Sequence, residues 1–285
     1  MATFTVYSYQ FRPLFEDQPS LFPEDNLSPE KVWDRKQGLF KSIFGENLHF
    51  RYRNVTFSHE IIYNENELIV LRIANNKKIT QESQFVAKKL DHNPSCAIII
   101  DNRKDVQNLY IEDDSYSFSD PSVVANILEK TFNVCLEAYG LGISLNKRFK
   151  SHEFWDVVAE ADDGIEMVRF SFLYPNLPRV QEKIDEMLSK TSREVHSKKT
   201  NIEFNSGDGE ALHIDKGNED LNNLVSASSE SGSVIKVKKK GSRRHTEIGN
   251  TSETVEIENL DNALTSDLLN SAAQKLLSIL NKLRK

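Results

Sequence analysis

The chain has 285 residues, of which 38% are apolar and 28% are charged, and its formal net charge is −7 at pH 7. This balance is typical of a globular protein with a substantial core, and the length accommodates two domains. The acidity excludes a generally basic surface, so any phosphate contact must come from a local concentration of cations.

The N-terminus MATFTVYSYQFRPLF lacks the basic opening and the continuous apolar run of a secretory leader. No stretch approaches the roughly 20 uninterrupted apolar residues that a spanning helix requires. The two cysteines, Cys96 and Cys135, lie in apolar surroundings without a partner at Cys-x-x-Cys spacing. We therefore expect a soluble, cytoplasmic protein with buried, reduced thiols and no membrane span.

The first half of the chain shows mainly the patterns of strands. Apolar residues on both faces of TFTVYSYQF predict a strand that is covered on both sides. Ser28 and Pro29 begin a predicted helix over 29–44. Period-two runs from 48 to 74 predict strands, and residues 96–101 and 108–113 predict a further hairpin. The short joins favour antiparallel pairing.

The second half alternates helices and strands. The predicted elements are a helix over 121–139, a strand over 141–146, a short helix from Ser151, a strand over 165–174 and a helix over 180–195. The composition of 205–233 predicts a flexible boundary with little core of its own. We predict an α+β fold: an antiparallel-sheet domain with packed helices over 1–150, and a smaller C-terminal α/β region over 151–285.

Enzyme signatures are absent from the sequence. No phosphate-binding glycine loop, dinucleotide fingerprint or nucleophile elbow occurs. His59-Glu60 falls on a predicted strand, and His152-Glu153 falls at a helix start, where acids favour the helix dipole. Asp34-Arg35-Lys36, the one match to a nuclease-like acid-x-lysine pattern, falls inside a predicted helix. We name no catalytic residue, metal ligand or cofactor, and the sequence favours a protein that is not an enzyme.

The strongest local charge lies near the C-terminus. Residues 236–244 hold six cations in nine positions: Lys236, Lys238, Lys239, Lys240, Arg243 and Arg244. On a strand, Lys236, Lys238 and Lys240 point outward, while Ile235 and Val237 point inward and share their face with Lys239. Such a row suits a phosphate backbone, and the absence of interleaved aromatic residues favours duplex contact over single-strand stacking.

A charged hairpin without a ligand is the competing interpretation. The segment ETVEIE carries Glu253, Glu256 and Glu258, and antiparallel pairing of this segment with 233–240 would place some of these acids opposite the lysines. Three acids cannot neutralise six cations, so the arginines of the turn stay unpaired in this arrangement. Both interpretations remain open from the sequence.

The last helix, predicted over about 260–284, carries a broad stripe of leucines. A stripe of this kind either closes the core or pairs with its copy in a homodimer.

The segment IEMVRFSFLYPNLPRVQEKIDEM resembles part of the RexA-like and KwaB-like proteins of prophage exclusion and bacterial anti-phage defence. The resemblance covers the C-terminal half and lies in the order of elements: a strand ending at Pro175-Asn176, an amphipathic helix, a variable segment, a basic strand and a final helix. It implies a DNA-binding or nucleic-acid-sensing component that acts with a partner protein.

Together, these patterns predict recognition of nucleic acid, DNA favoured, in antiviral defence or phage exclusion, with the six cations contacting phosphates. Two alternatives remain open. One is an interaction protein that inhibits or scaffolds another protein through the hairpin and the last helix. The other is a divergent metal-dependent nuclease.

Overall fold

The computed structural model describes residues 2–14, 29–45, 47–173 and 199–258, and the single residues 191, 195, 197, 276, 278 and 280. The fold is α+β and dominated by antiparallel sheet, which confirms the predicted class. Two compact units form: Met1–Val6, Glu16–Ile143 and Thr254–Lys285 make unit 1, and Tyr7–Phe15 with Ser144–Glu253 make unit 2. This division differs from the predicted one (1–150 and 151–285) in three places: Tyr7–Phe15 belongs to unit 2, unit 2 resumes at Ser144, and the chain from Thr254 returns to unit 1.

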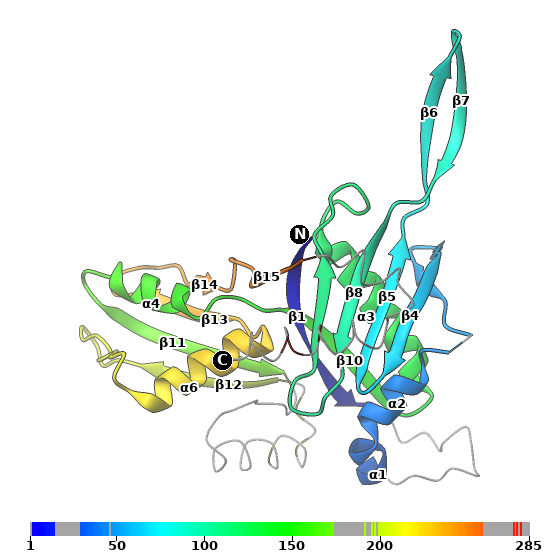
Figure 1. Cartoon of the computed structure of the whole chain (residues 1–285). Helices are drawn as coiled ribbons and strands as arrows, with labels where there is room; N and C mark the ends of the chain where they lie inside the picture. Colours follow the sequence, from blue (N-terminus) through cyan, green and yellow to red (C-terminus); the bar gives the residue numbers. More distant parts are fainter. Residues whose placement is uncertain are drawn as a thin grey trace. The chain divides into compact units, whose positions relative to one another are not determined.

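The large sheet has the strand order β10-β1-β9-β8-β5-β4, and β15 also pairs with β1 (Figure 1). Its strands are β1 (Ala2–Pro13), β4 (His59–Glu65), β5 (Leu68–Ala74), β8 (Ser95–Asp101), β9 (Asn108–Glu112), β10 (Leu141–Lys147) and β15 (Thr254–Ile257). Side chains from Phe4 to Phe11 are all buried, as expected for a strand covered on both faces. The register of β15, with Thr3 opposite Glu256, explains why the C-terminal end belongs to unit 1.

Helices and a small hairpin surround an aromatic cluster in unit 1. The elements are α1 (Pro29–Asp34), α2 (Lys36–Ser42), β2 (Phe50–Tyr52), β3 (Val55–Phe57) and α3 (Pro121–Glu137). The Phe132 ring of α3 lies 5.1 Å from Phe40 and 6.2 Å from Phe50 between centroids. Asp120 caps α3 by accepting a hydrogen bond from the Ser122 amide at 2.7 Å. The single helix predicted over 29–44 is instead two helices that break at Arg35.

A two-stranded ribbon joins β5 to β8. It consists of β6 (Lys77–Ser83) and β7 (Val86–His92), joined by Gln84 and Phe85, and in Figure 1 it continues past the end of β5. Ala74 pairs with Ser95 just before the ribbon begins, so the ribbon prolongs the β5–β8 hairpin. The sequence patterns predict no element for residues 75–95.

Unit 2 is a four-stranded sheet, β12-β11-β13-β14, with helices α4 and α6. The bounds are α4 (His152–Ala159), β11 (Ile165–Leu173), β12 (Lys199–Asn205), α6 (Glu219–Ser231), β13 (Ile235–Lys239) and β14 (Thr246–Ile248). The core combines one sheet face with both helices; Phe154 of α4, Val225 of α6 and Phe170 of β11 are all buried in it.

The prediction that 205–233 is a flexible boundary is wrong for α6. Asn218 caps this helix by accepting from the Leu221 amide at 3.1 Å, and Gly232 ends it at φ 66°. A Cβ at Gly232 would lie 2.6 Å from the Cβ of Asn146. The small residues of SASSESGS thus allow close packing, although their composition is typical of a linker.

Two further predictions fall mostly outside the described residues, namely the helices over 180–195 and 260–284. Within the latter, Leu276 and Leu280 are described and lie buried in the core of unit 1. For these two leucines the structure supports core packing, whereas the homodimer stays a prediction. No helix in the described ranges is long and apolar enough to cross a membrane.

Candidate nucleic-acid interface

Strand β13 fixes the direction of the first lysines. Ile235 and Val237 are fully buried against the helices of unit 2, as predicted. Lys236 and Lys238 alternate with them and therefore lie on the other face of the sheet. Lys239 is opposite Ile165 in the register, and its amine lies 3.8 Å from the carboxylate of Glu160 at the end of α4.

Each lysine of β13 has an acidic partner. Lys236 Nζ lies 2.7 Å from Glu247 Oε1 on β14, and Lys238 forms an ion pair with Glu166 on β11. Hydrogen bonding from Lys236 lowers the pKa of Glu247, and hydrogen bonding from Lys238 lowers that of Glu166. Three of the six predicted phosphate-binding cations are therefore compensated within the protein.

The predicted source of these acids is wrong. The segment ETVEIE does not pair with β13: it forms β15 in unit 1, and Glu253 pairs with Arg148 at 2.9 Å. The chain after the basic turn reverses sooner, at Thr246–Ile248, with Ile248 buried. Glu247 therefore lies opposite Lys236. The partner strand of β13 is the short segment directly after the turn, and not the longer, more regular ETVEIE segment.

The face of this sheet that carries Lys236 has one cross-strand row of charges that is neutral. Glu203, Arg169, Lys236 and Glu247 lie opposite one another in order across β12, β11, β13 and β14. Arg169 forms an ion pair with Glu203, so two carboxylates balance the two cations of the row. Hydrogen bonds from Asn205 and Arg169 lower the pKa of Glu203. A phosphate at this row would have to displace a carboxylate.

The turn after β13 differs from the strand itself. Lys240, Arg243 and Arg244 are exposed, and in the ranges that the structure describes no carboxylate forms an ion pair with them. The turn backbone is nevertheless ordered: the Lys240 amide donates to the Gly164 carbonyl at 2.9 Å, and the Arg244 amide donates to Ser242 Oγ at 3.1 Å. Three cations thus lie on a hydrogen-bonded turn; the sequence predicts this for Arg243 and Arg244 but places Lys240 on the strand, which ends at Lys239.

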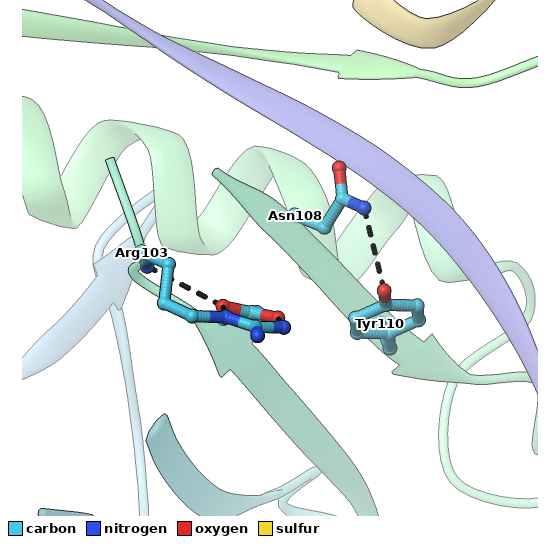
Figure 2. Close-up of polar contacts among 4 residues, drawn as sticks. Arg103, Asn108 and Tyr110 are labelled. Carbon is cyan, nitrogen blue, oxygen red and sulfur yellow. Dashed lines mark hydrogen bonds and ion pairs between the residues drawn. The ribbon is translucent and has the colours of Figure 1, made fainter. Parts of the chain in front are cut away.

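A second charged cluster lies in unit 1, at the end of the β8–β9 hairpin (Figure 2). Asp101 is fully buried, and its Oδ1 accepts from Arg103 Nε at 2.8 Å while its Oδ2 accepts from Nη2. Hydrogen bonding to Asp101 raises the pKa of Arg103. Nearby, Asn108 Nδ2 donates to the Tyr110 hydroxyl at 3.3 Å. Both carboxylate oxygens are occupied by one guanidinium, which indicates a structural clamp.

Two of the other residues that the sequence singled out, His59 and Glu153, have structural contacts. His59 lies on β4 with its ring 4.9 Å from that of Phe50. Glu153 at the start of α4 accepts hydrogen bonds from the amides of Gly249, Asn250 and Thr251. Burial acts to raise the pKa of Glu153, but these bonds outweigh it and the pKa is lowered. Among the described residues, no group of three His, Cys, Asp or Glu is placed to hold a metal ion.

The cysteines agree with the predicted free thiols, although only Cys96 is fully buried and Cys135 is half-buried. Burial raises the pKa of Cys96 to about 12.

Comparison with models of protein families, with curated proteins and with solved structures gives no match for this chain. The resemblance to RexA-like and KwaB-like proteins therefore stays a prediction.

Proposed function

We propose that this protein binds nucleic acid, with duplex DNA favoured, through the turn cations Lys240, Arg243 and Arg244. The main support for this proposal is a contrast within one hairpin. The lysines of β13 have carboxylate partners, whereas the cations of the turn have none among the described residues. Binding at the turn releases counterions from phosphates without first breaking an internal ion pair. Lys236, Lys238 and Lys239 then have a secondary role, as stabilisers of the strand.

The larger setting of this activity is also a proposal. The resemblance of residues 165–187 supports a component of a bacterial anti-phage defence or phage-exclusion system, working in the cytoplasm with a partner protein. The neutral row of paired charges in unit 2 favours one further candidate function, docking of a protein, because a row without net charge suits a polar protein surface better than a phosphate backbone.

The test is equilibrium binding of the purified protein to labelled duplex DNA, single-stranded DNA and RNA over a salt series. For duplex DNA, K240Q/R243Q/R244Q should reduce the slope of log K against log salt by up to about 0.9 for each phosphate that the variant no longer neutralises. The matched control, K236Q/K238Q/K239Q, removes the same charge from paired positions and should change the slope less.

Equal slopes for the turn variant and the unaltered protein would reject the proposal. Mg²⁺-dependent cleavage in the same assay, abolished by removal of one carboxylate, would instead support the nuclease alternative. A single partner protein that is retained after nuclease treatment, together with absence of DNA binding, would support the docking function.

A further inference from the structure

The β6–β7 ribbon, here called the arm, has at its tip a large apolar side chain exposed to solvent. The Phe85 side chain is 98% exposed, and Val86 next to it is 57% exposed. Exposure of a whole phenylalanine forgoes about 1.5–3 kcal/mol of burial free energy. These two adjoining side chains therefore contribute little to the core and are accessible to a partner.

The tip backbone is also unfavourable for the residues that occupy it. Gln84 has φ 51° and Phe85 has φ 66°, the two positive values of a type I′ turn, for which Asn-Gly is preferred. The other two-residue turns of unit 1, Arg53-Asn54 and Asn66-Glu67, each include an asparagine. A bulky aromatic residue at positive φ costs roughly 1–2 kcal/mol. Strain of this kind concentrates at functional positions.

Lysines lie on both faces of the arm, and the acid Glu82, opposite Ala87, lies nearer the tip than either of them. Gln81 is paired with Lys88, and Thr80 is paired with Lys89, so the two lysines lie on opposite faces. Both lie about 10–13 Å along the ribbon from Phe85. Within the described ranges neither forms an ion pair, and Lys78 is 4.0 Å from Asp91 with both side chains largely exposed.

We propose that the arm enters a groove of duplex nucleic acid, where Phe85 wedges between base pairs and Lys88 and Lys89 contact phosphates on the two sides of the groove. Apolar wedges inserted from a ribbon kink a duplex, and lysines on both faces match the two phosphate-lined walls of a groove. The inference rests on the proposed function only in sharing its class of partner, since the arm belongs to unit 1 and the basic turn to unit 2.

The arm fits two other partners less well. A membrane would gain one aromatic side chain while the polar Gln84 entered with it, and one short apolar anchor gives only marginal membrane binding. A protein interface would meet a broken apolar surface, because the Gln81–Lys88 pair separates the exposed Ile79–Leu90 pair from the tip. Lysine is depleted at the centres of protein interfaces.

The test is fluorescence energy transfer between the ends of a duplex of about 30 base pairs, the length over which protein-induced bending is measurable. The unaltered protein should bring the ends together. F85A should abolish the bend, F85W should retain it, and K88Q/K89Q should reduce the salt slope of binding by up to about 1.8, from two phosphate contacts.

Q84N/F85G controls for the possibility that F85A loosens the hairpin, because it supplies the preferred turn sequence while it removes the aromatic wedge. This variant should bind the duplex without bending it. Binding of the unaltered protein without a bend, or bending that survives in both F85A and Q84N/F85G, would overturn the proposal. The proposal would also fail if F85A left DNA bending unchanged but weakened binding to phosphatidylserine vesicles or self-association of the protein.

The same assay separates the two proposals. K240Q/R243Q/R244Q should still bend the duplex at saturating protein. If this variant binds like the unaltered protein while F85A loses the bend, the function proposed for the turn fails and the arm proposal stands. If K240Q/R243Q/R244Q weakens binding while F85A bends the duplex like the unaltered protein, the proposal for the turn stands and the proposal for the arm fails.

Discussion

The two lysine-bearing hairpins of this chain differ in what surrounds them. The strand β13 lies between two neighbours, and these strands and the end of α4 supply a carboxylate for each of its lysines. Among the described residues, no further strand pairs with the arm, and no carboxylate forms an ion pair with Lys88 or Lys89. The density of lysines in the sequence is therefore a poor guide to the charge available to a ligand.

The apolar residues of the two hairpins also differ in burial. Ile235 and Val237 alternate with the lysines of β13 and are fully buried. Ile79 and Leu90 lie opposite each other on the two strands of the arm and are 43% and 41% exposed. Apolar strand residues thus close a core in one hairpin and stay at the surface in the other.

The largest difference between the hairpins should be in stability. V237D places a charge in the core of unit 2 and should lower the free energy of unfolding by about 3–5 kcal/mol. I79D changes an exposed position of the arm and should stay within about 0.5 kcal/mol. Urea unfolding of V237D is followed by Trp155 fluorescence, with Trp33 replaced by Phe, which reports on unit 2; unfolding of I79D is followed by Trp33 fluorescence, with Trp155 replaced by Phe, which reports on unit 1. A similar loss of stability in both variants would show that the arm is part of the core.

The next effect concerns the charge that becomes available when ion pairs are removed. E166Q/E247Q releases Lys238 and Lys236, so DNA binding should strengthen and the salt slope should steepen by up to about 1.8, from two further phosphates neutralised. E256Q/E258Q is the matched control, because it makes the same charge change at the acids that the sequence, wrongly, pairs with the basic strand. Equal effects of the two variants would indicate a response to net charge alone.

A smaller effect is expected at the strained tip. Q84N/F85G should stabilise the arm by about 1–2 kcal/mol, since it removes a bulky residue from positive φ. Hydrogen exchange of the arm amides should then slow by about tenfold, because each 1.4 kcal/mol of opening free energy is a factor of ten. N54G changes a turn that already has a suitable residue and should alter exchange little. Faster exchange in Q84N/F85G would contradict the assignment of strain.

The smallest effect is on titration. Because Lys238 lowers the pKa of Glu166, the ion pair is present above the ordinary value of 4.5 and is lost as pH falls through the lowered pKa. K238Q should return this pKa toward 4.5, and K240Q should leave it unchanged. Carbon NMR of the glutamate carboxyls measures both. An unshifted Glu166 in the unaltered protein would remove the pairing on which the comparison depends.

Sequence patterns predict much of this fold and less of the candidate interface. The strands and the helix at 121–137 follow from local alternation and from the Asp120-Pro121 cap. Glu166 and Glu160 lie about 70 to 80 residues from their lysine partners, so no local pattern connects them with β13. The arm is absent from the predicted elements because Gln84-Phe85 is not a turn sequence, and its paired lysines at 77–78 and 88–89 are the available signal.

The proposed function requires that cations without a carboxylate partner are the ones that meet phosphate. NMR of the lysine Nζ and arginine Nε groups during titration with duplex DNA observes each of these cations separately. We expect shifts at Lys240, Arg243 and Arg244, with Lys236 and Lys238 unchanged. Shifts at Lys236 and Lys238, with the signals of Lys240, Arg243 and Arg244 unchanged, would show instead that the strand, and not the turn, binds phosphate.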